Sequence, residues 1–184
     1  MSVKNQKLDE LAAKLQEDEQ AFAEIYDYLL PRIYNYLLRR TGGKEVAEDL
    51  SSKTFLKVVE NLSDFSGNAK AFTAWVYRIA QNCLIDHYRS SNSQTKVLFY
   101  SNEDLSRLET PSKDDAKKSL QVREAKEEVI KMLSLLETAE QEILGLKFLD
   151  ELDNEEIAKI LKIKKNAVAV RLHRAMQKLK KVAV

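Results

Sequence analysis

Proline and glycine are scarce in this chain of 184 residues, which has two prolines and four glycines. Average soluble chains contain about 12% of these two residues together. Sandwiches, barrels and hairpin-rich folds need turn residues at close intervals, so the scarcity nearly excludes them. Apolar residues make up 44% of the chain and charged residues 32%, which suits a core covered by polar helix faces. The composition favours an all-α fold. The length of the chain suits one domain or two small ones.

Cysteine is nearly absent, since Cys83 is the only one. A single thiol forms no intramolecular disulfide and no thiolate metal cluster, which fits a reducing compartment. The longest apolar runs span only a few residues, so the sequence shows no transmembrane helix and no secretory leader. We therefore expect a cytoplasmic protein without a membrane span.

Residues suited to catalysis are also scarce. The two histidines, His87 and His173, fall in different predicted domains. The sequence has no phosphate-binding glycine loop, no paired zinc-ligand motif and no nucleophile–base arrangement. Cys83 falls on the apolar side of its predicted helix, which favours a buried thiol over a reactive one. We expect no enzymatic activity, no metal site and no cofactor.

The net charge of +1 hides an uneven distribution of charge. Residues 123–156 hold four basic and eleven acidic side chains, whereas residues 157–184 hold nine basic and no acidic ones. An acid-free basic end favours a surface that binds a polyanion. From charge alone, a solvated helix with lysines on its wet side is an equal alternative.

Apolar residues recur at helical spacing from Phe22 to Leu37, with Pro31 between them. Pro31 is either a kink or the first residue of a new helix, and Gly42-Gly43 is the expected cap at the end. Two more helices are predicted at about 45–62 and 70–89, on either side of a loop at 63–68.

Both of these later helices have apolar faces. In the first, apolar contacts are expected from Val46, Leu50, Phe55, Val58, Val59 and Leu62. In the second, one face carries Phe72, Trp75, Val76, Ile79 and Cys83, and the opposite face carries Tyr77, Arg78, Gln81, Tyr88 and Arg89, with Asn82 at its edge. Aromatic rings interleaved with arginines and amides suit single-stranded nucleic acid, because bases stack on rings and phosphates pair with guanidinium groups. An ordinary exposed surface is the alternative.

The helical pattern fails between about 90 and 113, where Ser, Asn, Asp and Glu dominate. This stretch reads as a flexible linker. Helical spacing resumes near residue 116 and continues to 136. We predict an N-terminal domain at 1–92, a linker at 93–122 and a C-terminal domain at 123–184.

The last fifty residues predict a helix-turn-helix. Thr138 with Gln141 makes a capping box that starts one helix, and Asp153 with Glu156 makes another that starts a helix at 154–161. A three-residue connection leads to a basic helix at 165–180. Such a second helix lies in the DNA major groove, although two short helices at this spacing also occur in helical bundles.

The basic helix has two distinct faces. Val168, Leu172, Ala175 and Leu179 are expected to pack on Ile157, Ile160 and Leu161. The opposite face, with the residues at its start, carries Lys164, Lys165, Asn166, Ala169, Val170, His173, Arg174 and Gln177. Arginine donates to guanine or phosphate, Asn and Gln pair with adenine, and small apolar side chains contact thymine methyls. This face therefore fits a DNA groove.

Four segments together resemble a known family. Residues 49–58 resemble the helix by which bacterial sigma factors hold RNA polymerase, and residues 71–82 resemble their promoter-melting segment. Residues 155–161 and 168–175 resemble their C-terminal helix-turn-helix. Two such domains with a linker and little else are similar to the extracytoplasmic-function (ECF) group.

The resemblance implies a promoter-specificity subunit that binds bacterial core RNA polymerase and promoter DNA. It implies that the clamp-binding positions are Asp49, Leu50, Lys53, Thr54 and Phe55. It implies that the strand of the melted minus-ten element contacts Ser66, Gly67, Asn68, Ala69, Lys70, Tyr77, Arg78, Gln81, Asn82 and Arg89. It implies that the minus-thirty-five duplex is read by Lys165, Asn166, Ala169, Val170, His173 and Arg174. The family is often held inactive by an anti-sigma protein, and this sequence identifies none.

The chain departs from the family pattern at two places. Ser52-Lys53 stands where the family usually has Gln-Glu, and Ala169-Val170 stands where it has Lys and Ser. The promoter sequence therefore does not carry over from the family. Two other classes of protein stay as alternatives: a freestanding helix-turn-helix regulator, which reads two half-sites as a dimer, and a helical interaction protein that binds no DNA.

Overall fold

The computed structural model describes residues 3–90 and 135–182. These residues form helices joined by short connections and no strand, which confirms the all-α prediction. The predicted linker at 93–122 lies outside the described residues, as does nearly all of the helical spacing at 116–136.

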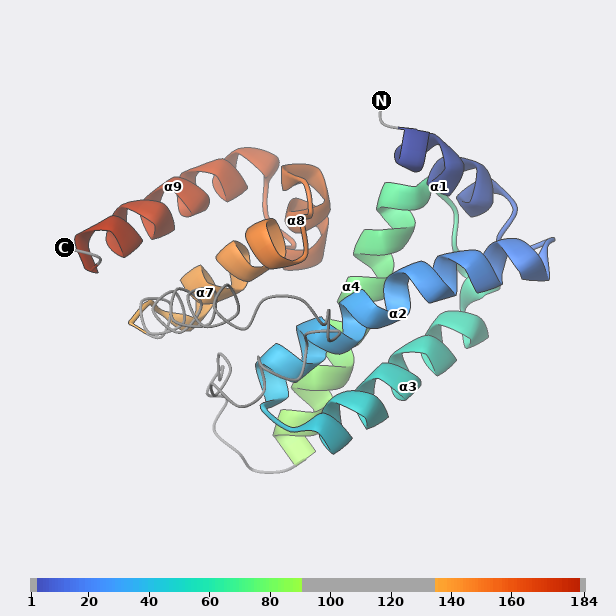
Figure 1. Cartoon of the computed structure of the whole chain (residues 1–184), viewed down its shortest axis with the longest axis horizontal. Helices are drawn as coiled ribbons and strands as arrows, with labels where there is room; N and C mark the ends of the chain where they lie inside the picture. Colours follow the sequence, from blue (N-terminus) through green and yellow to red (C-terminus); the bar gives the residue numbers. More distant parts are fainter. Residues whose placement is uncertain (1–2, 91–134, 183–184) are drawn as a thin grey trace, which may run out of the picture.

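The N-terminal half consists of four α-helices and one 3-10 turn (Figure 1). They are α1 (Val3–Ala13), α2 (Glu19–Thr41), α3 (Lys44–Glu60), η1 (Leu62–Asp64) and α4 (Ala69–Ser90). Helix α1 is not among the predicted helices, although Leu8, Leu11 and Ala12 have helical spacing and pack on the core.

Pro31 lies inside α2 and does not end it. A proline in a helix interior removes one backbone donor and costs about 3 kcal/mol. Pro31 faces solvent, whereas Leu29 and Ile33 on either side of it are buried. Burial of the opposite face of the helix therefore offsets the free-energy cost of the proline. The helix ends at Gly42, whose φ of 66° is left-handed and whose N–H donates to the Leu38 carbonyl, as the glycine pair predicted.

The N-terminal core forms where α2, α3 and α4 meet. Its fully buried side chains include Leu29, Ile33, Leu37, Leu50, Val58, Phe72 and Leu84. Trp75 is half-buried and stacks against Phe65 and Phe72, with ring centroids 5.2 and 5.6 Å apart, so it belongs to the apolar side of α4 as expected.

The C-terminal half consists of α7 (Thr138–Leu144), the π-helical turn η2 (Gly145–Leu149), α8 (Asn154–Leu161) and α9 (Lys165–Val182). The predicted capping box of Thr138 and Gln141 is wrong by one residue. Helix α7 begins after Glu137, whose N–H donates to the Glu140 carboxylate, whereas the buried Gln141 side chain donates to the Leu136 carbonyl and so does not make the box. The box of Asp153 and Glu156 is confirmed, with hydrogen bonds of 2.7 to 2.9 Å.

Helices α8 and α9 form the predicted helix-turn-helix. Lys162 ends α8 in the left-handed conformation, with φ 54°, which turns the chain into α9. Val168 and Ala175 of α9 and Ile157 and Ile160 of α8 are buried in the pair.

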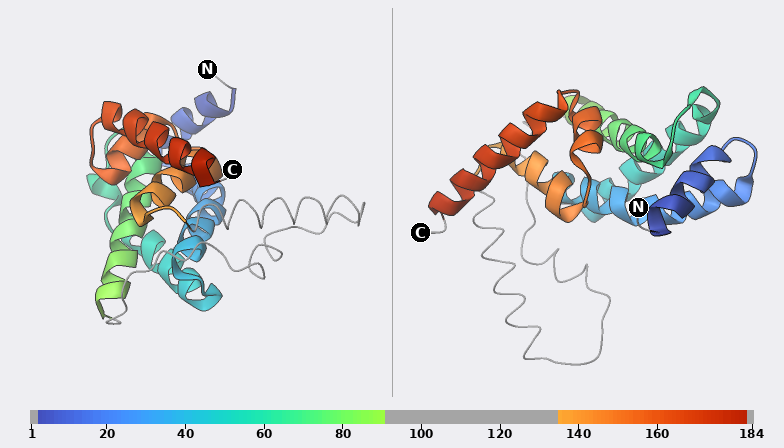
Figure 2. Two further views of the ribbon diagram at one scale, coloured as in Figure 1. Left: turned by 90° about the vertical axis from the view of Figure 1, so that its left-hand side faces the viewer. Right: turned by 90° about the horizontal axis from the view of Figure 1, so that it is seen from above.

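The C-terminal half packs directly on the N-terminal half. Helix α8 packs against α4, and both views in Figure 2 place the two helices side by side. The two halves are far apart in sequence, so local sequence patterns could not predict this packing.

Candidate nucleic-acid and partner surfaces

The outer face of α9 is arranged as the sequence predicted. Its exposed side chains include Lys164, Lys165, Asn166, Ala169, Val170, His173, Arg174 and Gln177. Val170 is 50% exposed although it is apolar. Gln177 and His173 hydrogen-bond at 2.9 Å, and Lys165 lies 3.8 Å from Glu155. The other side of the helix is buried, so this face is the one a partner can reach.

The loop before α4 is fixed by hydrogen bonds from distant residues. The Gln16 amide donates to the carbonyls of Leu62, Ser63 and Phe65 at 2.7 to 3.3 Å. The Asn68 side chain accepts from the Ala71 N–H at 3.0 Å, and Asp9 accepts from the Ala69 N–H at 3.1 Å. Both bonds satisfy donors that a helix start leaves unpaired.

The backbone conformation of this loop requires a glycine at position 67. Its φ is 152°, and a Cβ placed there would lie 2.9 Å from the Ala71 Cβ. Only glycine adopts this conformation without strain. Ser66, Gly67, Asn68 and Lys70 of the predicted strand-binding set are exposed around this turn, and Ala69 is half-buried.

The second face of α4 differs from the prediction. Tyr77 is fully buried and lies edge-on to Tyr36, with ring centroids 5.3 Å apart. Gln81 donates to the Glu142 carboxylate at 3.1 Å. Asn82 and Arg89 are exposed, whereas Arg78 is half-buried. The expectation of an exposed Tyr77 is wrong because α2, through Tyr36, and the C-terminal half, through Asp150, both lie against this side of the helix.

The two halves contact each other through ion pairs and one amide–carboxylate hydrogen bond, and we call this contact the seam. Its cations and amide are Arg32, Arg39, Arg40, Lys70 and Gln81, and its acidic side is Glu142, Asp150, Glu151 and Asp153. Arg39 pairs with Asp150 at 2.5 Å, and both side chains are buried. Arg40 pairs with Glu142 at 3.0 Å, and Lys70 pairs with Asp153 at 2.7 Å.

The ionisable groups of the seam are strongly perturbed. Burial raises the pKa of Tyr77 well above its usual value, and the negative charge of Asp150 adds to the effect. Burial also raises the pKa of Asp150, although Arg39 opposes the shift. The pKa of Asp153 is lowered: partial burial raises it, but hydrogen bonds from Lys70 and the Glu156 and Glu155 backbones outweigh that. The seam thus holds charged groups away from full solvation.

The predicted clamp-binding residues of α3 divide into two groups. Leu50, Thr54 and Phe55 are buried in the N-terminal core, so their side chains do not reach the surface of the free chain, and their contact with a partner stays a prediction. They are buried because α3 presents that side to α2 and α4. Asp49 and Lys53 are exposed and pair with each other at 2.6 Å.

Two apolar residues of α3 are exposed, which the sequence pattern did not predict. Leu56 is 59% exposed and Val59 is 55% exposed, which corrects the prediction that Val59 faces the core. The signal was present, because Phe55-Leu56 and Val58-Val59 are adjacent apolar pairs. Two neighbours on a helix point about 100° apart, so both members of such a pair seldom face one core.

A shallow groove of about 410 Å³ lies between α2 and α3. Its lining comes from Tyr26, Leu30, Pro31, Tyr34, Glu48, Ser51 and Ser52. Figure 1 shows α3 on the side of the N-terminal half that faces away from the C-terminal helices, and the groove borders this helix. Within residues 3–90 and 135–182, no helix combines the length and apolar content needed to cross a bilayer.

Comparison with known proteins identifies both halves. Residues 25–94 match the family model Sigma-70 region 2, and residues 126–179 match Sigma-70, region 4. The chain is 30% identical over 176 residues to the ECF RNA polymerase sigma factor SigW of Bacillus subtilis, covering 89% of each protein. It is also 30% identical over 171 residues to the ECF sigma factor BldN of Streptomyces coelicolor, of which it spans 63%.

A solved structure has the same fold. It is the sigma factor RpoE of Bartonella quintana, solved in complex with the anti-sigma factor NepR. Its TM-score to this chain is 0.62, with 17% identity over 88% of this chain and 96% of that one. With two family models that match in order along most of the chain and a relative aligned over nearly its full length, this protein belongs to the ECF sigma factors, promoter-specificity subunits of bacterial RNA polymerase.

Proposed function

We propose that this chain directs bacterial core RNA polymerase to promoters, reading duplex DNA with α9 and melted DNA with the α4 region. The observation that supports this most is the outer face of α9. Eight predicted contact residues lie on it or at its start, all exposed, on a helix held by the capped helix α8. Arg174 fits a guanine or a phosphate, Asn166 fits an adenine, and Val170 fits a thymine methyl.

The proposal is tested with holoenzyme bound to a library of promoter duplexes. Arg174→Ala should cost about 1–3 kcal/mol in binding and relax the preference at one base position. Lys180→Ala on the same helix is the matched control, since it removes a positive charge about one turn beyond Gln177, the last of the proposed contact residues. It should weaken all sequences about equally. Unchanged affinity and unchanged preference in Arg174→Ala would overturn the assignment.

The clamp-binding surface is proposed on the outer side of α3. Asp49 and Lys53 are exposed there, Leu56 and Val59 supply apolar contact area, and the groove beside α2 adds tyrosines. Exposed apolar residues next to such a groove are typical of a protein-binding surface. Leu50, Thr54 and Phe55 support this surface from inside the core.

The melted strand is proposed to follow the loop at residues 65–68 and the start of α4. Asn68 and Lys70 are exposed there, and Asn82 and Arg89 are exposed further along the helix. Gly67 permits a strand to approach the backbone closely because it has no side chain. Tyr77 and Gln81 contribute only after the C-terminal half moves away.

Sigma factors are initiation subunits rather than catalysts, and we propose no enzymatic activity for this chain. It would act in the cytoplasm with core polymerase, and an anti-sigma protein would be its regulatory partner. A freestanding helix-turn-helix regulator has no need for the region 2 domain matched at residues 25–94. The sigma function therefore explains both halves of the chain and the freestanding regulator explains one.

A further inference from the structure

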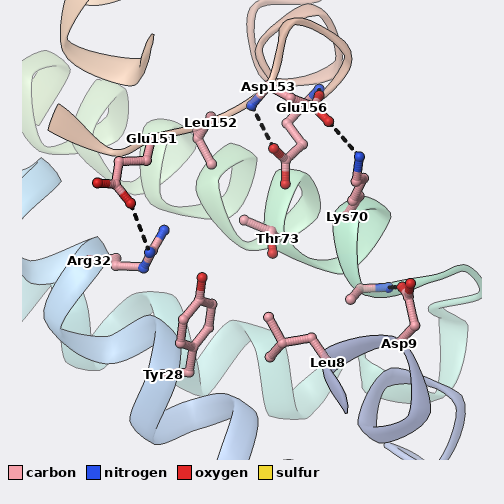
Figure 3. A pocket seen from close by; sticks show the side chains of 11 residues that line it. Leu8, Asp9, Tyr28, Arg32, Lys70, Thr73, Glu151, Leu152, Asp153 and Glu156 are labelled. Atoms are coloured by element: carbon pink, nitrogen blue, oxygen red, sulfur yellow. Dashed lines mark hydrogen bonds and ion pairs between the residues drawn. The ribbon is translucent and has the colours of Figure 1, made fainter. Parts of the chain in front are cut away.

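The loop proposed to receive the melted strand is held by two residues that precede the segment matching region 2. That match begins at residue 25, whereas the two residues are Asp9 of α1 and Gln16 of the turn that follows it. Asp9 accepts from the Ala69 N–H at 3.1 Å, and Figure 3 shows its carboxylate turned toward the start of α4. The loop is therefore shaped by a part of the chain to which the region 2 match assigns no role.

Gln16 binds three carbonyls of this loop with a single amide group. Its Nε2 lies 2.7 Å from the Phe65 oxygen, 3.0 Å from that of Leu62 and 3.3 Å from that of Ser63. An amide nitrogen carries two N–H donors, so one of them is shared between two carbonyls. Because the three oxygens converge on one nitrogen, the backbone from residue 62 to residue 65 curves around Gln16.

The turn that carries Gln16 is itself held in place. Leu15, the preceding residue, is buried in the N-terminal core. The Asp18 N–H donates to the Lys14 carbonyl at 2.9 Å, and the Asp18 side chain caps α2. Gln16 therefore reaches the loop from a turn whose own backbone is fixed on both sides.

Aromatic packing fixes the loop from the opposite direction. The Phe65 ring lies against the rings of Phe72 and Trp75, with centroids 5.0 and 5.2 Å away. The Phe65 carbonyl is bound by Gln16 at the same time. The exposed residues 66–68 follow directly in the chain, so these two contacts of Phe65 set the direction in which they leave the core.

We propose that Gln16, assisted by Asp9, is a positioning residue that holds the loop at residues 65–68 in the conformation that binds the melted strand. This inference rests on the proposed function and extends the strand-binding region into the turn between α1 and α2. A loop that is ordered before binding loses little conformational entropy when the strand arrives, whereas a free loop loses more. Gln16 is exposed, so water replaces its hydrogen bonds when it is changed, and the core stays intact.

The first experiment measures the loop in the free, full-length chain. Gln16→Met nearly keeps the length of the side chain and removes its donors, and Gln20→Met makes the same change at an exposed site on α2. Hydrogen exchange of the peptide that covers residues 61–71 should become about twofold to tenfold faster in Gln16→Met, which corresponds to the net contribution of one hydrogen bond. Gln20→Met should exchange like the wild-type chain.

The second experiment measures strand binding with the holoenzyme. The probes are the pooled promoter duplexes of the library, either blunt or carrying a short single-stranded tail of random sequence. The ratio of the two affinities gives the contribution of the strand. Gln16→Met should lower this ratio by about twofold to tenfold. It should leave the affinity for blunt duplexes unchanged, because α9 is the helix proposed to read duplex DNA.

Two further comparisons separate positioning from stability. Gln16→Lys supplies N–H donors to the loop carbonyls again and should recover the ratio. Gln16→Met combined with Gln20→Lys adds the same charge without those donors, and it should not recover the ratio. Val58→Ala removes a fully buried side chain from the core. It should lower the stability of the N-terminal half and leave the ratio unchanged.

Three results would overturn the proposal: loop exchange in Gln16→Met equal to that of Gln20→Met, faster exchange with an unchanged affinity ratio, or an equal fall of the ratio in Val58→Ala. A wild-type holoenzyme that gains no affinity from the tail would also overturn it. Transcription with the same holoenzyme then separates this inference from the proposed function. Initiation would keep the sigma function without the positioning role, whereas no initiation would reject both.

Discussion

Arg39 and Asp150 form a buried ion pair across 111 positions of sequence, with a nitrogen–oxygen distance of 2.5 Å. Arg39 lies near the end of α2 and Asp150 follows η2, so this pair joins the two halves of the chain. Removing one partner of a buried pair leaves an unpaired charge, which costs about 3–5 kcal/mol if it stays buried. Separation of the two halves would instead return that charge to water, so the pair couples its own stability to the contact between the halves.

The pair provides the first prediction. Arg39→Met should open the chain by leaving Asp150 without its guanidinium partner in the closed form. Arg39→Met combined with Asp150→Leu should close it again, because replacing both charges with apolar side chains removes the desolvation cost. Small-angle scattering of the free chain measures the change as a larger radius of gyration in the single variant only. A double variant as extended as the single one would contradict the role of the pair.

Gly67 and Gly145 provide a matched pair of glycine substitutions. Gly67→Ala should destabilise the N-terminal half by about 1–3 kcal/mol, since φ is 152° and the new Cβ would lie 2.9 Å from the Ala71 Cβ. Gly145→Ala should be neutral or stabilising by up to about 1 kcal/mol, because its φ is −59° and no atom lies within 4 Å of the new Cβ. Thermal unfolding followed by circular dichroism measures both. Equal losses of stability would refute the backbone argument.

Substitutions at the neighbouring residues Val58 and Val59 distinguish core packing from partner binding on α3. Val58→Ala should lower the free energy of unfolding by about 2 kcal/mol because its side chain is fully buried. Val59→Ser should leave unfolding nearly unchanged and weaken binding to core polymerase, because its side chain is 55% exposed. Unfolding curves and fluorescence anisotropy with labelled chain give the two quantities. Normal core affinity in both Val59→Ser and Leu56→Ser would place the clamp contact elsewhere.

Alkaline pH should open the seam. Burial raises the pKa of Tyr77 above its usual 10.0, and the hydrogen bond to Asp153 raises the pKa of Lys70 above 10.5. A group whose pKa is raised in the closed form stabilises that form below its usual pKa. The contribution is lost as pH rises through the raised value. Asp150 adds to the effect on Tyr77, whereas Arg39 and Arg32 oppose it.

Fluorescence energy transfer between one dye on each half of the chain, measured from about pH 7 to pH 11, tests this prediction. It should fall above about pH 10 while the helical circular dichroism signal persists. Tyr77→Phe with Lys70→Gln removes both titrating groups, so its transfer should depend less on pH. An identical alkaline transition in the variant would assign the opening to other groups.

Local patterns predicted the parts of the structure that depend on nearby residues. The helix Asn154–Leu161 has its predicted bounds because Asp153 and Glu156 specify its start within three residues. The outer face of α9 followed from periodicity alone. Leu8, Leu11 and Ala12 carried a similar signal for α1, which was overlooked because the segment is largely polar.

The second face of α4 could not be predicted in the same way. Tyr77 and Arg78 read as surface residues because the helix had already been given one apolar face. The side chains around Tyr77 come from distant positions: Tyr36 of α2 lies against its ring, and Asp150 of the other half lies 73 positions away in sequence. Sequence periodicity shows that a helix has a second face, but not what packs on it.

The measurement that tests the central claim most directly is run-off transcription over a promoter library, with bacterial core RNA polymerase in the presence and absence of this protein. The sigma assignment predicts new start sites that require the protein, and the aligned upstream sequences should share two elements. Arg174→Ala should alter preference within the upstream element. If a folded protein bound cognate core polymerase and produced no new start sites, the assignment would be contradicted.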